Sequence, residues 1–217
     1  MGTAVAFDAH CRRCPRLASH LDTVRAAHPG YHAAPVPAFG VERPRLLVVG
    51  LAPGMHGANR TGRPFTGDHA GVLLYATLHR IGLADNAQSL HADDGLRLHQ
   101  CRITNAVKCL PPENRPTGKE VANCNAYLSE ELRQLPERVV ILALGGVAHR
   151  AVLRALGLRQ AAHGFGHGAE HRLADGRWLV DSYHCSRYNT QTGRLTAEAF
   201  ETVLRRAATL AGIIDRP

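Results

Sequence analysis

The segment Arg45-Leu46-Leu47-Val48-Val49-Gly50 decides the fold class of this chain. It is an uninterrupted apolar run that ends at a glycine, and such a run is typical of a strand buried on both faces of a parallel sheet. Three further runs have the same character and cover residues 101–107, 138–145 and 177–183. The four runs together predict the strands of one sheet.

Helical patterns lie between these strands. Apolar residues spaced by three and four positions predict helices over residues 71–81, 121–132, 146–156 and 197–210, and another is expected near residues 16–21. Because strands alternate with helices, we expect an α/β fold, a three-layer α/β/α sandwich with a central, mostly parallel four-stranded sheet. A chain of 217 residues suffices for one sizeable core, so residues 1–217 are expected to form a single domain.

The charge of the chain favours a polyanionic partner. Its formal net charge is +8, and Lys108 and Lys119 are the only lysines among its 26 basic residues. A strong arginine bias is also typical of a GC-rich genome, so composition alone leaves both explanations open. The first residues show no secretory signal, and no apolar run reaches membrane-spanning length. We therefore expect a cytoplasmic protein without a membrane partner.

Four cysteines form two separated pairs, Cys11 with Cys14 and Cys109 with Cys124. In a chain without an export signal, such pairs indicate a metal or iron–sulfur site before they indicate disulfides. Four thiolates complete either a zinc site or a [4Fe–4S] cluster. The alternative is four unrelated buried thiols. Cys101 is expected to be a buried strand residue.

Polar segments follow three of the predicted strands, at residues 50–68, 104–107 and 182–196. In parallel α/β sheets, ligands bind beyond the carboxyl ends of the strands. The first segment is rich in glycine and carries Arg60 and Arg63, but it lacks the Walker pattern of phosphate-binding loops. The glycine-rich segment 163–168 is expected to be a turn before a short strand pair, since no helix signal follows it.

The ordered set of motifs resembles family 5 of the uracil-DNA glycosylases, the UDGb type. Four segments carry the resemblance: Cys-x-x-Cys-Pro-Arg-Leu from Cys11, Gly-Leu-Ala-Pro to Gly-Arg-Pro-Phe-Thr-Gly-Asp over 50–68, Ile-Thr-Asn-Ala-Val over 103–107, and Ser-Tyr-His to Thr-Gly-Arg-Leu-Thr over 182–196. The resemblance covers almost the whole chain. It implies a DNA repair enzyme that flips out uracil and hydrolyses its N-glycosidic bond, leaving an abasic site.

The resemblance also implies roles for particular residues. Phe65 is expected to stack on the flipped base, and the Asn105 amide to match the O4 and N3–H groups of uracil. His184 is expected to donate a hydrogen bond to O2, where negative charge develops as the bond breaks. Main-chain groups of Gly50, Ala52 and Gly54 are expected to form the floor of the base pocket. Taken singly, each of these side chains has a structural explanation as a core or capping residue.

Water activation is the least defined step in the sequence. Relatives carry a carboxylate or an amide in the first loop, where this chain has Leu51 and Ala52. Asn59 is the predicted water-positioning residue, and Asp68 is a second candidate. Without a carboxylate or amide in the first loop, the pocket is also expected to admit hypoxanthine or other deaminated bases.

Contacts to DNA are expected from residues around the pocket. Arg60, Arg63, Arg187 and Arg194 are predicted to contact phosphates, although each also has an explanation as a solvated surface charge. Tyr188 lies in the segment expected to wedge into the duplex. Cys185 stands where relatives have proline, so this loop is expected to differ in rigidity and to be oxidisable.

The resemblance assigns the four paired cysteines to a [4Fe–4S] cluster. The expected partner is DNA containing uracil or another deaminated base, bound by a monomer associated with the nucleoid. Two alternatives stay open. One is a family 4-type uracil-DNA glycosylase, which would carry an acidic residue in place of Leu51. The other is a non-catalytic iron–sulfur DNA-binding protein.

Overall fold

The central sheet of the computed structural model, which describes residues 5–215, has six strands in the order β1-β3-β2-β4-β6-β5. Residues 1–4 and 216–217 lie outside this range. The predicted single domain includes all six of them, and the search for a secretory signal includes the first four. The strands are β1 (Phe39–Gly40), β2 (Leu46–Gly50), β3 (Cys101–Asn105), β4 (Val140–Leu144), β5 (Glu170–Arg172) and β6 (Trp178–Ser182).

The four predicted strands form the parallel centre of this sheet, and the α/β class is confirmed. The predicted strand number is corrected from four to six, because β1 and β5 pair antiparallel with β3 and β6 at the two edges. These edge strands span two and three residues. They are too short to produce the apolar periodicity that identifies a strand in a sequence. The short strand β5 follows the 163–168 turn and pairs with β6, so the expected short strand pair is present.

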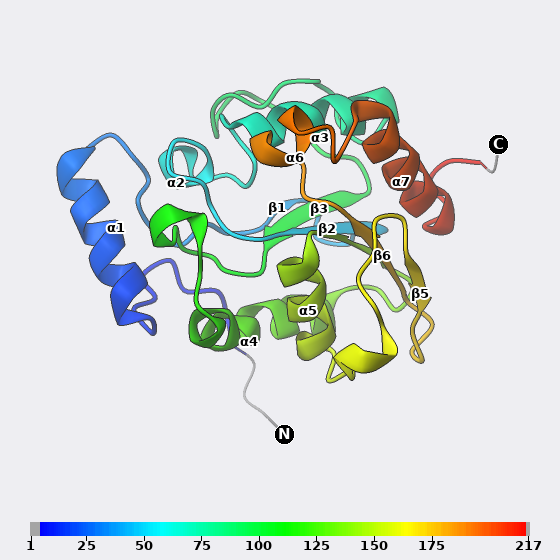
Figure 1. Ribbon diagram of the computed structural model, residues 1–217. Helices are drawn as coiled ribbons and strands as arrows, with labels where there is room; N and C mark the ends of the chain where they lie inside the picture. The colour runs from blue at the N-terminus through cyan, green and yellow to red at the C-terminus, as the bar shows by residue number, and fades with distance from the viewer. Residues whose placement is uncertain (1–4, 216–217) are drawn as a thin grey trace.

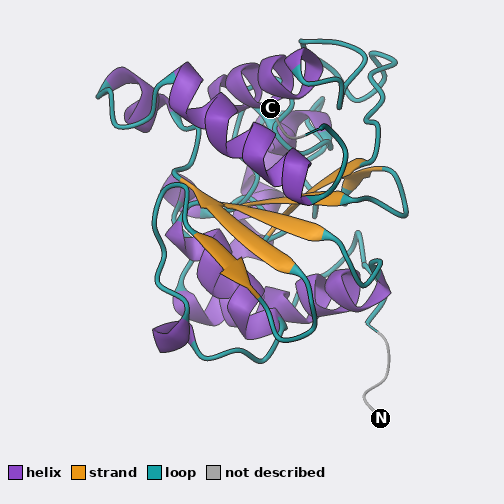
Figure 2. Cartoon of the chain, turned by 90° about the vertical axis from the view of Figure 1, so that its right-hand side faces the viewer, coloured by secondary structure: helices purple, strands orange, loops and turns teal. Residues whose placement is uncertain are grey.

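Helices cover both faces of the sheet (Figure 1). They are α1 (Pro15–Ala27), α2 (Ala58–Thr61), α3 (His69–Arg80), α4 (Gly118–Gln134), α5 (Gly146–Ala155), α6 (Arg187–Gln191) and α7 (Ala197–Leu210), with two 3-10 turns at Pro112–Asn114 and Gln160–Ala162. Figure 2 shows the sheet enclosed between two helical layers. The helices predicted from apolar spacing are present, whereas α2 and α6, of four and five residues, were not predicted as helices.

Each face of the sheet has its own hydrophobic core. Successive strand residues point to opposite faces, so Leu46 and Val48 join the core beneath α3 and α7, and Leu47 and Val49 join the core beneath α4 and α5. This double burial explains why β2 is apolar at every position. Cys101 lies fully buried in the first core, as predicted.

The ends of the helices are fixed by side-chain caps. Asp68 accepts a hydrogen bond from the Gly71 N–H at the start of α3, at 2.8 Å. Thr117 and Glu120 form a capping box at the start of α4. Glu120 also accepts two hydrogen bonds from Arg16, at 2.8 and 2.7 Å, which fasten α1 to α4. The N-terminal helix is therefore tied to the body of the fold.

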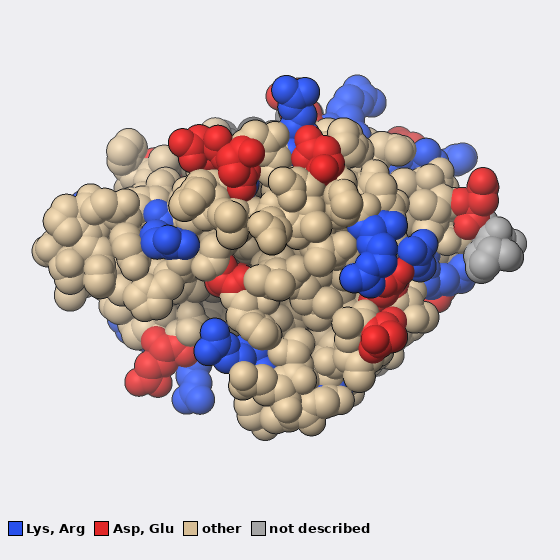
Figure 3. Space-filling model, turned by 90° about the horizontal axis from the view of Figure 1, so that it is seen from above, with Lys and Arg blue, Asp and Glu red and all other residues tan. Residues whose placement is uncertain are grey.

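Charges of both signs are interspersed on the face over α3 and α7 (Figure 3). The excess of basic residues is not gathered into one patch on this face. Among the described helices, none is long and apolar enough to cross a membrane.

Candidate active site

Four predicted site residues, Gly50, Phe65, Asn105 and His184, meet where β2 and β3 end side by side. Gly50 and Asn105 are paired across the two strands, so the Asn105 side chain and the loop after Gly50 begin at the same place. A Cβ atom at Gly50 would lie 2.5 Å from Cζ of Phe65 and closer still to Oδ1 of Asn105. Only glycine fits there, because a side chain would fill the space that brings Phe65 and Asn105 together.

The rings of Phe65 and His184 face each other in this pocket. Their centroids are 5.8 Å apart and their planes differ by 27°. A flat base cannot lie between them, since two stacking contacts need about 7 Å. In the described structure the two rings therefore contact each other, and a base that stacks on Phe65 needs His184 or Phe65 to move, or must use the other face of the Phe65 ring.

Two of the predicted site residues, Asn59 on α2 and Asn105 on β3, have buried polar atoms without partners in the described chain. In residues 5–215 these atoms are Oδ1 of Asn105 and both Oδ1 and Nδ2 of Asn59. Buried polar atoms are nearly always paired in native proteins, and leaving one unpaired costs about 1–3 kcal/mol. Such atoms are therefore available to a ligand or a water molecule. The roles of Asn105 in reading the base and of Asn59 in positioning water stay predictions.

His184 follows β6 and is held by its backbone. Its carbonyl oxygen accepts a 2.8 Å hydrogen bond from Asn189 Nδ2 on α6. A Cβ atom at Gly145, which has a φ of +94°, would lie 3.4 Å from the His184 Cβ atom. Burial lowers the pKa of His184 to about 4, so the imidazole is neutral near pH 7 and retains one N–H donor. Asn189 and Gly145 escaped the sequence prediction because their contacts join separate elements.

Asp68 brings a carboxylate to the edge of the same site. Its Oδ1 caps α3. The rest of the side chain packs against Gly57, where an added Cβ atom would lie only 2.6 Å from the Cβ atom of Asp68. Burial raises the pKa of Asp68, although N–H donors of α3 partly offset the effect. One carboxylate oxygen therefore remains for another partner, and the group is more basic than an exposed aspartate.

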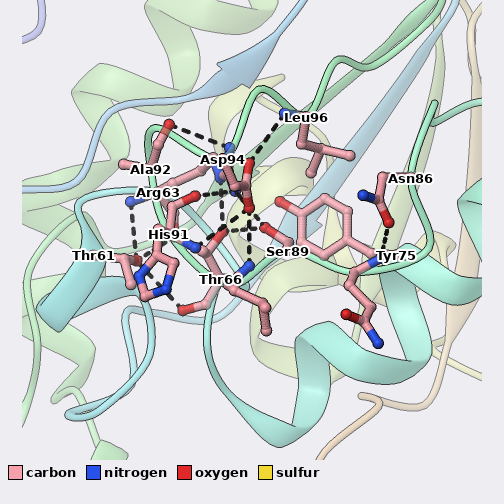
Figure 4. A network of polar contacts seen from close by, with 12 residues as sticks. Thr61, Arg63, Thr66, Tyr75, Asn86, Ser89, His91, Ala92, Asp94 and Leu96 are labelled. Carbon is pink, nitrogen blue, oxygen red and sulfur yellow. Dashed lines mark hydrogen bonds and ion pairs between the residues drawn. The ribbon is translucent and has the colours of Figure 1, made fainter.

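Arg63 lies inside the protein, so the prediction that it contacts phosphate is wrong. It is 4% exposed, and its guanidinium donates to Ser89 Oγ at 2.8 Å, to Thr66 Oγ1 at 2.9 Å and to Asp94 at 2.5 Å (Figure 4). Burial alone would raise the pKa of Asp94, but hydrogen bonds from Arg63 and from main-chain N–H groups hold it well below its usual value. The pair anchors the loop before α3.

The backbone around Phe65 is also held in place by its neighbours. The Tyr75 hydroxyl donates a 2.8 Å hydrogen bond to the Pro64 carbonyl. Phe65 then adopts a left-handed backbone conformation, with a φ of +55°. A non-glycine residue is held in this conformation only where its surroundings determine it. The network thus fixes the aromatic wall of the pocket.

A groove of about 880 Å³ extends from the site between α2, α3 and α6. Gly54, Asp68, Arg60 and Arg187 line it, and Arg60 also lines a neighbouring hollow. The predicted phosphate contacts Arg60 and Arg187 are thus placed along one surface.

Tyr188 is 71% exposed on α6, next to Arg187 in the sequence. Arg194 is also exposed, and its guanidinium lies 4.4 Å from the centre of the Tyr183 ring. Cys185 is fully buried, and burial raises its pKa, so the expectation of an oxidisable loop cysteine is corrected.

The four paired cysteines line one small cavity. All are free thiols, which excludes disulfides among them. The Lys108 N–H donates to Cys124 Sγ at 3.2 Å, and Asn123 Nδ2 lies 3.6 Å from Cys14 Sγ. Ala52 packs against this cluster of cysteines while its chain continues into the base pocket, so the two sites are adjacent.

Comparison with known proteins agrees with this geometry. Residues 37–208 match the uracil DNA glycosylase superfamily. The chain is 51% identical over 208 residues to a type-5 uracil-DNA glycosylase of Thermus thermophilus, with 94% of each chain covered. It is 47% identical to a type-5 enzyme of Pyrobaculum aerophilum, over 94% of this chain and 91% of the relative. A type-4 uracil-DNA glycosylase of the same organism is 36% identical over 59% of this chain.

The fold, the pocket and these similarities show that the chain belongs to the uracil-DNA glycosylase superfamily. Within the superfamily, the similarity that spans nearly the whole chain is to type 5, whereas the similarity to type 4 covers little more than half of it. The resemblance to family 5 is confirmed, and the family 4 alternative is not supported.

Proposed function

We propose that the pocket formed by Gly50, Phe65, Asn105 and His184 receives the flipped uracil of a damaged DNA strand. The protein is a uracil-DNA glycosylase, a hydrolase that removes uracil in DNA repair. One observation carries the assignment of the pocket: the unpaired Oδ1 of buried Asn105 and the Phe65 ring both approach Gly50, and Phe65 stacks with His184. An amide oxygen can accept the N3–H of uracil, and the amide N–H₂ can donate to O4.

His184 stabilises the leaving base in this mechanism. As the bond between N1 and C1′ breaks, its electron pair moves onto uracil and negative charge develops at O2. A neutral imidazole N–H donates a hydrogen bond to O2 that strengthens as this charge grows. The same bond is weaker in the ground state, so it accelerates the reaction.

Asp68 is the carboxylate that we assign to the attacking water. Its position on the groove and its raised pKa support this role, because a more basic carboxylate accepts the water proton more readily. The water oxygen then bonds to C1′ and the proton passes to Asp68. Asn59, whose buried amide has no partner in the described chain, is the second candidate and would orient water without accepting its proton.

Single-turnover cleavage of uracil-containing DNA tests these assignments. Asp68→Asn is expected to lower the rate by about 10²-fold or more, as for the loss of a general base. Asn59→Ala is expected to lower it less, because an amide only orients the water. If Asn59→Ala lowers the rate at least as much as Asp68→Asn, Asn59 and not Asp68 is the residue that positions the attacking water.

The range of bases is a separate proposal. Neither Leu51 nor Ala52 places a carboxylate or amide in the first loop, so the pocket lacks a polar side chain there that would exclude a purine. We expect measurable excision of hypoxanthine as well as uracil. Cleavage of matched duplexes with one uracil, one hypoxanthine or only undamaged bases tests this, and cleavage of uracil alone would contradict it.

For the cysteine site we propose a [4Fe–4S] cluster held by Cys11, Cys14, Cys109 and Cys124. Four thiolates around one zinc ion lie about 3.8 Å apart, since each Zn–S bond is about 2.3 Å. In residues 5–215, the cysteines form no group of three whose sulfur atoms approach within 4.8 Å. The wider spacing fits a cluster whose ligands surround several irons, and N–H donors to Cys124 and Cys14 suit charged sulfur ligands. When bound, the cluster supplies a cross-link between the N-terminal segment and α4.

The cluster is tested by metal content. Protein isolated without oxygen is expected to be brown and to contain about four irons. Cys109→Ser is expected to lower stability more than it changes the chemistry of the base pocket. Colourless protein with one zinc bound to sulfur would overturn the proposal.

We further propose that the chain acts as a single-domain monomer. The substrate supports a place at the nucleoid, where uracil in cellular DNA occurs. Arg60, Arg187, Arg194 and Tyr188 are the proposed DNA contacts, because they are accessible near the groove or on the segment around α6.

A further inference from the structure

A second group of potential metal ligands lies far along the sheet from the cysteines. His149 on α5, His171 on β5 and Asp181 on β6 place one ligand atom each within 4.8 Å of one another. Nδ1 of His149 is 2.8 Å from Oδ1 of Asp181, and Nε2 of His171 is 3.3 Å from Oδ2. The three side chains are 2%, 15% and 0% exposed.

Hydrogen bonding requires a proton or a metal ion between His149 and Asp181. Nε2 of His149 lies 2.9 Å from the carbonyl oxygen of His163, which can only accept, so this nitrogen carries a hydrogen. A neutral imidazole then has a lone pair on Nδ1, and this lone pair faces the Asp181 oxygen at 2.8 Å. Two lone pairs repel each other at this distance. Either a proton or a metal ion must lie between them.

We propose that His149 Nδ1, His171 Nε2 and the Asp181 carboxylate bind one divalent transition-metal ion, with zinc as its simplest representative. Two imidazoles and one carboxylate suit zinc and related ions better than Mg²⁺ or Ca²⁺, which prefer oxygen ligands. Tetrahedral zinc with bonds of about 2.0–2.1 Å separates neighbouring ligand atoms by about 3.3 Å. The 2.8 and 3.3 Å separations here need only small side-chain movements to reach that geometry.

The surroundings of His149 match those of a metal ligand. Imidazoles that bind a metal through one nitrogen usually donate the other N–H to a carbonyl or carboxylate, which fixes the ring orientation. The contact from His149 Nε2 to the His163 carbonyl supplies this bond. The partial exposure of His171 leaves a route for the ion and for a water molecule in the fourth position. Zinc binding displaces the proton between His149 and Asp181 into solvent.

The proposed ion would join three elements that meet near the end of β6. It would tie the edge strand β5 to β6 and both to α5. Asp181 lies close in sequence to His184, so the site would stiffen the strand that presents the catalytic histidine. The inference stands on this cluster alone and does not depend on the proposed catalytic roles.

Metal analysis of the intact protein, with its cysteine site filled as isolated, tests the proposal. After incubation with zinc and gel filtration, the wild type is expected to retain about one zinc per chain. His171→Gln is expected to retain none, while His79→Gln, which changes an exposed histidine on α3, is expected to behave as the wild type. Zinc at about 100 times its dissociation constant is expected to raise the thermal midpoint of the wild type by roughly 5 °C or more.

The position of the ion is checked by anomalous diffraction at the zinc absorption edge and by X-ray absorption. A peak between the two histidines, with nitrogen and oxygen ligands at about 2.0–2.1 Å, supports the proposal. Wild-type protein that keeps no zinc, or keeps it only with sulfur ligands at about 2.3 Å, overturns it. The cluster would then be a proton-bridged His149–Asp181 pair. This measurement does not require that any variant fold.

Discussion

Two buried polar clusters differ in how fully their polar atoms are paired, one around Arg63 on the loop between β2 and α3 and one at Asn105 on β3. In the first, the guanidinium of Arg63 is surrounded by acceptors from Thr66, Ser89 and Asp94. In the second, Oδ1 of Asn105 has no partner among residues 5–215, although Asn105 is just as deeply buried as Arg63. The site therefore combines a saturated network around Arg63 with an unpaired amide at Asn105.

The difference in pairing indicates different roles: the paired cluster supports the loop, and the unpaired amide is suited to binding a ligand. A fully paired buried network resists rearrangement, because each broken bond leaves a desolvated group behind. A buried unpaired atom has already lost its hydrogen bonds to water and has formed none within the protein. A ligand that forms a hydrogen bond with this atom therefore pays little further desolvation cost on the protein side. The Arg63 network holds Phe65 in a left-handed conformation, and the unpaired Asn105 Oδ1 and the Phe65 ring both approach Gly50.

Breaking the saturated network should have the largest effect. Arg63→Met leaves Asp94 buried without its cation, and the free energy of unfolding is expected to fall by about 3–5 kcal/mol. Denaturant unfolding measures this loss. Arg60→Met, which changes an arginine of the neighbouring groove, is the control and should change stability little. A loss below about 1 kcal/mol in Arg63→Met would mean that the network is not a support.

Changing a residue of the base pocket should lower the rate of uracil cleavage and leave the stability of the fold unchanged. His184→Ala removes the donor to uracil O2, and the single-turnover rate is expected to fall by about 10²-fold, as for an oxyanion-hole donor. Affinity for uracil-containing DNA should change little. His79→Ala is the matched control. A rate equal to that of the wild type at saturating enzyme would remove His184 from the mechanism.

The third prediction compares stability across the two clusters directly. Ser89→Ala strips a partner from Arg63 and is expected to cost about 1–3 kcal/mol. Asn59→Leu removes an amide that has no partner in the described chain, so stability is expected to be unchanged or higher by about 1 kcal/mol. Thermal unfolding of both variants gives the comparison. A large loss in Asn59→Leu would show that this amide supports the fold.

The smallest effect concerns pH. Asp68 must be ionised to accept the proton of water, and its pKa is raised, so the cleavage rate should rise with pH through a range above that of an exposed aspartate. His184 has a pKa of about 4, so the profile should show no step near 6.5 from its titration. Asp68→Asn should abolish the acid limb. If that limb persists in the variant, it belongs to another group.

The sequence predicted what depends on local pattern. The central strands β2 and β4 are predicted because they are apolar at every position, β3 and β6 because they carry short apolar runs, and the long helices because their apolar faces repeat. The edge strands β1 and β5 and the short helices α2 and α6 contain too few residues to show a period. Their existence depends on neighbours supplied by the rest of the fold.

The same limit explains the outcome for the site residues. Phe65, Asn105 and His184 lie in motifs of the family, and the structure brings them together. Arg63 lies in the same motif as Phe65, yet its partner Asp94 belongs to a separate loop that no sequence pattern connects with it. An arginine in a glycine-rich loop looks the same in sequence whether it meets phosphate or a buried carboxylate.

The pairing of Gly50 with Asn105 also has a consequence for how the protein folds. The two residues are neighbours in the sheet but far apart in the chain, and His184 arrives from a third, still later segment. Contacts between distant segments form slowly, because a long loop must close before it is stabilised by any pairing. No short fragment contains the pocket, so in a refolding experiment glycosylase activity should return only with the last long-range strand pairing, after the helices have formed.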